Sequence, residues 1–107
     1  MLRVDQGFEG GLVMTTLHVP ASEDVIVLFD PERRPARVLP WHPFQNVVRV
    51  DPPGRVKWRA EVVPAETTAK AWYRIAWDRW QLRAWTYSYE CQLDEGTGAI
   101  LSTTFTK

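Results

Sequence analysis

The prolines of this chain are confined to one part of it, and their placement limits the folds that it can adopt. All eight lie between Pro20 and Pro64, and none follows. Because proline cannot donate a hydrogen bond to a strand ladder, this part is expected to consist of short strands, edges and turns. The segment Glu32–Phe44, which prolines interrupt repeatedly, is expected to be an irregular connection. The chain after Pro64 is free to form longer strands.

Runs rich in β-branched and aromatic residues alternate with turn residues along the whole sequence, which is typical of antiparallel strands. The continuous apolar run Val25–Phe29 predicts a strand buried on both faces. In the run 56–63, Val56 and Trp58 are expected to share the buried face. A single long strand is expected from Gln81 to Leu93, with Leu82 on the face opposite Cys91. The full set of predicted strands covers residues 12–19, 25–29, 46–50, 56–63, 73–77, 81–93 and 99–106.

Short polar or glycine-bearing segments mark the turns between these strands. Pro53-Gly54 suits the central pair of a type II turn, because proline presets φ and glycine supplies a positive φ. Asp78-Arg79 begins a second turn, and Asp94–Gly98 forms a hairpin loop. Residues 64–71 are expected to form a loop or one short helix.

The sequence therefore predicts one all-β antiparallel domain over residues 1–107. We expect a small sandwich or partly open barrel of seven to eight strands, with meander-like hairpins and at most one short helix. The hairpins around Asp51–Gly54 and Asp94–Gly98 resemble those of β-propeller blades. The strands suffice for two blades, and a propeller needs at least about four, so a propeller formed by one chain is excluded.

Charge and cysteine content limit the classes of partner. The formal net charge is zero, which argues against nucleic acid, since phosphate binding depends on excess basic residues. Cys91 is the single cysteine, so no disulfide forms within the chain, as is usual in a reducing compartment. No apolar stretch has the length of a membrane helix or a signal peptide. A cytoplasmic protein without a membrane partner is expected.

No catalytic or metal-binding motif stands out. His18, His42 and Cys91 are far apart and form no ligand pattern, so neither a metal nor a cofactor is expected. Cys91 is expected to be a buried structural thiol. Glu61 and Glu90 are expected to pair with basic residues on neighbouring strands rather than to act as an acid–base pair. The sequence thus favours a protein that is not an enzyme, without deciding the question.

The densest feature is the segment Lys70–Trp85, in which arginines alternate with aromatic residues. Tryptophan, tyrosine and arginine dominate the energetic centres of protein interfaces, although such a segment can also be a sheet core with arginines covering its edges. A second aromatic cluster lies in the proline-rich loop, where it either binds a partner or plugs one end of the fold. The candidate binding residues are Trp41, His42, Trp72, Arg74, Arg79, Trp80 and Arg83.

Two functions follow from these features. The first is an interaction module that self-associates or docks another protein through the aromatic and arginine residues. The second is a small-molecule-binding β-barrel or a small enzyme. Its pocket would be lined by Trp41, His42, Trp85, Tyr87 and Tyr89.

Overall fold

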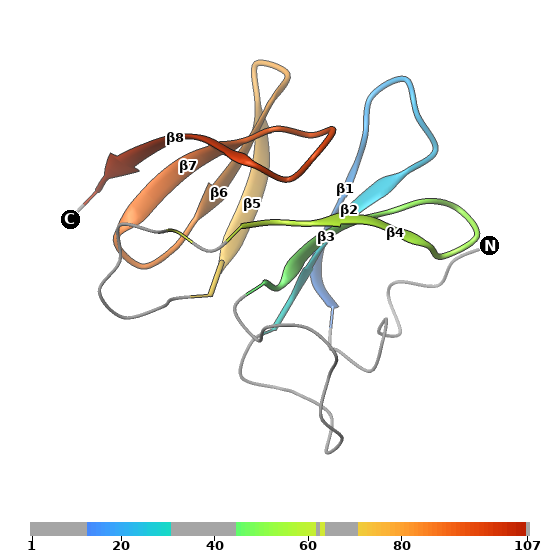
Figure 1. Ribbon diagram of the computed structural model, residues 1–107, viewed down its shortest axis with the longest axis horizontal. Coiled ribbons are helices and arrows are strands. Elements are labelled where there is room, and N and C mark those ends of the chain that lie inside the picture. The colour runs from blue at the N-terminus through green and yellow to red at the C-terminus, as the bar shows by residue number, and fades with distance from the viewer. Residues whose placement is uncertain (1–12, 31–44, 62, 64–70, 107) are drawn as a thin grey trace.

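The fold is all-β, as predicted. The computed structural model describes residues 13–30, 45–61, 63 and 71–106, which contain eight strands and no helix (Figure 1). The residues of the short helix considered between Pro64 and Ala71 lie outside the described part, except for Ala71 itself. The strands are β1 Val13–His18, β2 Val25–Phe29, β3 Val47–Val50, β4 Val56–Arg59, β5 Arg74–Asp78, β6 Gln81–Trp85, β7 Tyr89–Leu93 and β8 Ile100–Phe105.

The strands form two separate four-stranded sheets, each a simple meander. Sheet 1 has the order β1-β2-β3-β4 and sheet 2 the order β5-β6-β7-β8, and every neighbouring pair is antiparallel. Edge strand β1 of sheet 1 contacts edge strand β5 of sheet 2. Because the two sheets share one hydrophobic core, the fold is a sandwich rather than a barrel.

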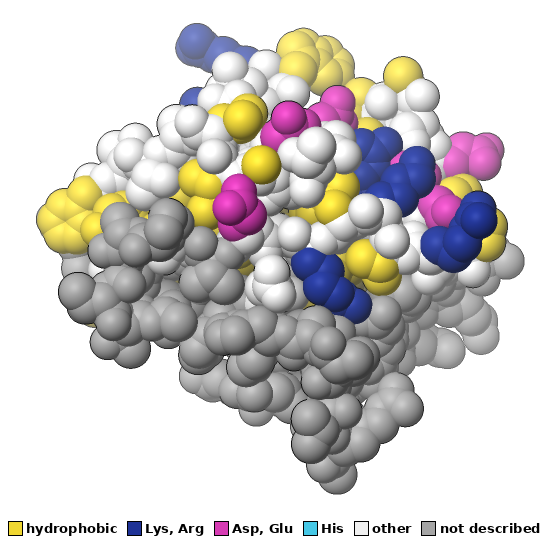
Figure 2. Space-filling model, in the orientation of Figure 1, with side chains coloured by type: hydrophobic (Ala, Val, Ile, Leu, Met, Phe, Trp, Pro, Cys, Tyr) yellow, Lys and Arg dark blue, Asp and Glu magenta, His cyan; other side chains and the backbone are white. Residues whose placement is uncertain are grey.

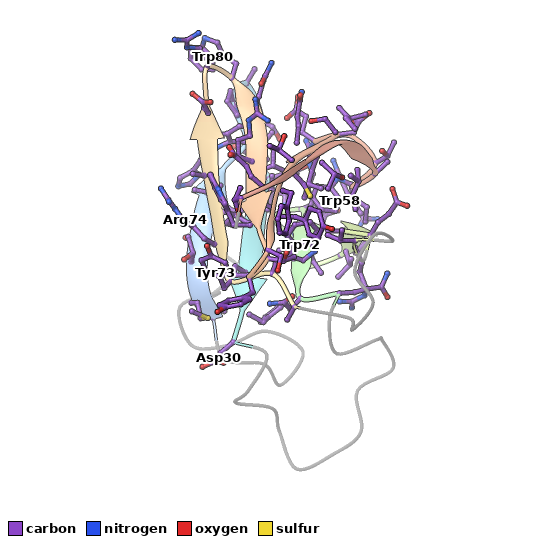
Figure 3. The ribbon with its side chains drawn as sticks, turned by 90° about the vertical axis from the view of Figure 1, so that its left-hand side faces the viewer. Asp30, Trp58, Trp72, Tyr73, Arg74 and Trp80 are labelled. Atoms are coloured by element: carbon purple, nitrogen blue, oxygen red, sulfur yellow. The ribbon has the colours of Figure 1, made fainter. Side chains whose placement is uncertain are left out.

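The shared core is built from the alternate residues that each sheet turns toward the other. Trp72, in the connection that leads into β5, is fully buried there, and Trp58 of β4 is nearly so (Figure 3). The predicted burial of the Cys91 thiol is confirmed. The buried strand residues of this core are Ile26, Leu28, Val47 and Trp58 from sheet 1 and Ile75, Leu82, Ala84, Cys91 and Leu93 from sheet 2.

Sheet 1 is also buried on its other face. Val27 and Phe29 of β2 form a second cluster with Val48 and Val50 of β3, and all four side chains are buried. The prediction that Val25–Phe29 is covered on both faces is therefore confirmed, since Ile26 and Leu28 belong to the first core.

One buried amide connects the two sheets. The Nδ2 group of Asn46 donates to the carbonyl oxygens of Phe29 and Trp72, both at 2.8 Å. Its Oδ1 accepts from the backbone N–H of Trp72 at 3.0 Å. Asn46 thus binds the backbone of Trp72 in both directions, as a neighbouring strand would. The Trp72 indole N–H donates to the Glu61 carbonyl at 3.2 Å, which adds a second link between the sheets.

The loop between β7 and β8 is fixed onto sheet 1. The Glu95 carbonyl accepts two hydrogen bonds, from Trp58 Nε1 at 2.7 Å and from Arg49 Nη1 at 2.8 Å. Glu61 donates its backbone N–H to the Gly98 carbonyl at 3.2 Å, and its carboxylate accepts from the Ile100 N–H at 2.7 Å. The loop predicted at 94–98 is confirmed, and the Glu61 carboxylate, for which a basic partner was expected, accepts the N–H of the first residue of β8.

The prediction of one long strand over 81–93 is wrong. The chain reverses at residues 86–88, where Thr86 donates its N–H to the Tyr89 carbonyl at 2.9 Å. The Thr86 hydroxyl in turn accepts from the Tyr89 N–H at 3.2 Å. This segment contains no glycine, proline, asparagine or aspartate, so the strongest markers of a turn are missing and Ser88 is its one common turn residue. Because the chain reverses, Leu82 faces the same core as Cys91 instead of the opposite side.

Two local predictions around β4 are also corrected. The register shifts between Arg49 and Val50, where β3 pairs with β4. This irregularity puts Val56 with the second cluster, whereas Trp58 faces the shared core. In the preceding turn, Gly54 donates its N–H to the Asp51 carbonyl at 2.9 Å, so the central pair is Pro52-Pro53 and not Pro53-Gly54.

We predict that Gly98→Ala destabilises the protein by about 2 kcal/mol or more. Gly98 has a φ of 77°, and a Cβ added there would lie 2.5 Å from Trp58 Cε3. Gly96→Ala is the matched control in the same loop, because its Cβ would meet only the Asp94 carboxylate, at 3.2 Å. Denaturant unfolding followed by tryptophan fluorescence measures both variants. An equal effect of the two substitutions would contradict the close packing of Trp58 on Gly98.

Candidate functional site

The hairpin formed by β5 and β6 carries most of the candidate binding residues. The two strands pair in regular register from Arg74 opposite Trp85 to Asp78 opposite Gln81. Ile75, Leu82 and Ala84 point into the core, so the alternate residues Arg74, Arg83 and Trp85 lie on the outer face. The structure therefore gathers these charged and aromatic side chains on one solvent-facing surface.

The turn of this hairpin is strained. It contains only two residues, Arg79 and Trp80, and their φ angles are 51° and 67°. Positive φ at both central positions is the signature of a type I′ turn, which normally uses Asn-Gly because other residues clash there. Each residue in this conformation costs roughly 1–2 kcal/mol. Because the strands pair in regular register up to Asp78 and Gln81, only two residues are left to reverse the chain, and both adopt positive φ.

The strained turn holds Trp80 out into solvent. Its side chain is 82% exposed, the most exposed large hydrophobic residue in the described part of the chain. Figure 3 shows Trp80 at the tip of the hairpin, away from Trp58 and Trp72, which lie between the sheets. In Figure 2, hydrophobic and basic side chains lie beside each other over this tip.

The arginines on the outer face are held by specific contacts. The Arg74 guanidinium lies 4.5 Å from the centre of the Trp85 ring, across the strand pair. This cation–π arrangement orients the guanidinium while leaving its donors available to solvent. Arg83 donates through Nη2 to Gln81 Oε1 at 2.8 Å and lies 3.8 Å from the Asp78 carboxylate. We call Arg74, Arg79, Trp80, Arg83 and Trp85 together the hairpin surface.

Trp72 does not belong to this surface, so its prediction as an exposed binding residue is wrong. Its side chain is fully buried. The expectation rested on its place in the aromatic and arginine segment, but Trp72 precedes β5, where the Asn46 amide binds its backbone. Trp77 is partly buried against the core and donates to the His18 carbonyl at 2.8 Å. Trp41 and His42 lie outside the described residues.

The residues expected to line a ligand pocket do not converge in the described part of the structure. Trp85 lies on the outer face of sheet 2, whereas Tyr89 packs against the shared core. Tyr87 lies in the turn between β6 and β7 and is 63% exposed. These three side chains therefore do not line one common pocket.

A second group of charged residues lies between the sheets at the end where β3 meets β4. The buried carboxylate of Asp24 contacts Lys57 Nζ at 2.6 Å and Arg49 Nε at 2.9 Å. The Lys57 ammonium, together with Arg49, holds the pKa of Asp24 below its ordinary value despite the opposing effect of burial. Arg49 also bonds the Glu95 carbonyl, so this group fastens the β7–β8 loop and has a structural role.

Among the residues that the structure describes, no three histidine, cysteine or acidic side chains cluster as metal ligands. Within the same residues, no helix is long and apolar enough to cross a membrane.

The fold and the site together define a small two-sheet β-sandwich with an exposed aromatic and basic hairpin. The chain belongs to the family described as a domain of unknown function (DUF7957), whose model matches residues 15–105. No curated protein and no solved structure matches the chain. The family match covers most of β1 and all of β2 to β8, including both strands of the hairpin surface.

We predict that Asp24→Asn lowers stability near neutral pH and that the difference from the wild type shrinks in acid. A carboxyl whose folded pKa is depressed stabilises the fold above its unfolded pKa, here near 3.8, and loses that effect as the pH falls through the lower folded value. Urea unfolding at pH 7 and pH 3 measures the difference. Glu23→Gln, at the exposed neighbouring position, is the charge-matched control. A difference that stays constant with pH would contradict the ion-pair assignment.

We predict that Arg79→Asn combined with Trp80→Gly raises stability by about 1–3 kcal/mol. The pair replaces two residues strained at positive φ with the preferred residues of a type I′ turn. Thermal and urea unfolding measure the gain. Gln81→Asn, at the adjacent strand position, is the control, and we expect no gain from it. A loss of stability in the double variant would show that Trp80 supports the fold.

Proposed function

We propose that this domain is a non-enzymatic interaction module that docks a partner protein through the hairpin surface. One observation carries the proposal: a strained two-residue turn holds a tryptophan 82% exposed. Local strain of this kind persists where it is part of a function. A glycine-bearing turn would be more stable but would present no indole.

The chemistry of the surface indicates how a partner would be bound. An exposed indole contributes most binding free energy when it enters an apolar pocket. Tryptophan and arginine are also among the residues most enriched in interface hot spots. Arg79 is exposed next to it in the turn, and Arg74 is exposed at the other end of β5. Guanidinium groups form paired hydrogen bonds with carboxylates. The partner surface that fits is therefore an apolar pocket flanked by acidic side chains.

The stacked geometry of Arg74 supports the same function. Its guanidinium is oriented on Trp85 before any partner arrives, which lowers the entropy lost on binding. We place this function in a reducing compartment such as the cytoplasm, because Cys91 is a buried thiol in the core.

Photo-crosslinking in cells of the source organism tests this function. A benzophenone amino acid replaces Trp80 in one variant and Tyr87 in a matched control, since both residues are exposed aromatics in turns of sheet 2. We expect an adduct of defined mass from position 80 and none from position 87. Adding Arg74→Glu to the first variant should reduce the adduct severalfold, because it reverses a charge on the hairpin surface that the partner would contact.

Equal labelling from positions 80 and 87, or labelling that Arg74→Glu leaves unchanged, would contradict a docking role for the hairpin surface. The mass of the adduct identifies its partner as another protein or as a second copy of this chain.

A further inference from the structure

Strand β8 is an edge strand. Its start is irregular at Leu101, and the Ile100 N–H is bonded to the Glu61 carboxylate, but the following residues Ser102–Phe105 carry none of the features that usually protect an edge. It has a single neighbour, β7, and its residues Leu101–Phe105 are all exposed. The strand Ile100–Phe105 contains no charge, no proline and no glycine. Exposed, uncharged edges tend to pair with another strand, because their outer backbone groups lack partners. Figure 1 shows β8 at one margin of the molecule, next to the C-terminus.

The other three edges of the sandwich differ from β8. Strands β1 and β5 contact each other across the two sheets. Strand β4 carries Lys57 and Arg59, and charged side chains discourage edge pairing. Among the edges that the structure describes, β8 is therefore the one suited to receive a further strand.

The hydrogen-bond ladder shows which backbone groups of β8 point outward. Thr106 donates its N–H to the Ser88 carbonyl, at the end of the β7–β8 pairing. The groups that bond a neighbour alternate along an antiparallel strand, so Thr104 and Ser102 face β7. The N–H and C=O groups of Thr103 and Phe105 consequently point to the open edge.

We infer that two copies of this chain join through β8, antiparallel, about a two-fold axis at Thr103. This arrangement places each Thr103 opposite its counterpart, with both N–H groups donating across the axis. It also places Leu101 opposite Phe105 and Ser102 opposite Thr104. Every pair joins residues of like polarity, and none brings two charges together. Two four-stranded sheets thereby become one eight-stranded sheet.

The exposed apolar residues of the strand fit this arrangement. Leu101 is 55% exposed and Phe105 is 62% exposed, and they lie at equal separations from Thr103 in the sequence. The Phe105 ring is held by Tyr89, with ring centres 5.5 Å apart. Hydrophobic side chains are visible at the margin where β8 ends (Figure 2). Leu101 lies opposite the register shift at the start of the strand, and the regular part runs from Ser102 to Phe105.

Sedimentation equilibrium across the micromolar range tests the inference. We expect the wild type to move from the mass of one chain to that of two with rising concentration. Thr103→Pro removes an outward N–H without breaking the ladder to β7, and it should raise the dimer Kd at least about tenfold. Thr103→Val is the matched control, because it keeps the N–H and the β-branched shape, and it should leave the Kd nearly unchanged.

A charge-pairing experiment tests the position of the axis and does not depend on the proline variant. Leu101→Lys and Phe105→Glu should each be monomeric alone, because each places a charge opposite an apolar residue. Mixed together, they should form a heterodimer in which the lysine introduced into one chain meets the glutamate introduced into the other. Near-ultraviolet circular dichroism checks that the variants remain folded.

A wild type that stays monomeric throughout, or a Thr103→Pro variant that dimerises as the wild type does, would overturn the inference. A mixture that fails to associate would overturn the axis at Thr103. Arg74→Glu plus Trp80→Ala should leave the dimer intact. If instead that double variant abolishes it, the hairpin surface is the dimer contact and β8 is not.

Discussion

The sandwich depends on the carboxamide of Asn46, which hydrogen-bonds the backbone of both sheets at a point where no strand pairing joins them. Its two donors and its acceptor are all used, on Phe29 at the end of β2 and on Trp72 before β5. A buried amide that is fully hydrogen-bonded is stabilising, whereas the backbone groups it binds would be costly if left unpaired. Because the amide fits only one placement of Trp72, it fixes where β5 begins. The position of the following hairpin relative to sheet 1 follows from this contact.

The rest of sheet 2 is tied to sheet 1 at its opposite end. Arg49 and Trp58 both donate to the Glu95 carbonyl, and Gly98 leaves room for the Trp58 ring. The sheets are therefore joined near the start of β5 and again at the β7–β8 loop, with the apolar core between. The two proposed binding surfaces, the tip of the β5–β6 hairpin and the outer edge of β8, both belong to sheet 2, which these contacts hold on sheet 1. A rigid support of this kind reduces the entropy that each surface would lose on binding.

The fold class follows from residue patterns that are local in sequence. The alternation of apolar and polar residues, together with the turn residues, predicts the strands, although it joins β6 and β7 into one strand. The apolar run Val25–Phe29 predicts burial on both faces. The reversal at 86–88 could not be predicted, because its markers are a threonine hydroxyl and backbone contacts rather than glycine or proline. Trp72 was misplaced for a different reason: its burial depends on Asn46, a contact across 26 residues that no periodicity reveals. At the candidate site, the pattern proposes Arg74, Arg79, Trp80 and Arg83 as binding residues, which stays a prediction, whereas the left-handed turn at Arg79 and Trp80 is seen only in the backbone.

The Asn46 contact makes the two sheets one cooperative unit. Native-state hydrogen exchange at the Trp72 amide tests it most directly, because that N–H is bonded to the Asn46 side chain and to no strand. We predict that this amide exchanges only through global unfolding, with the same free energy of opening as the amides in the centres of β2 and β6. Exchange of the Trp72 amide at a distinctly lower free energy would show that the sheets separate independently, and would contradict this claim.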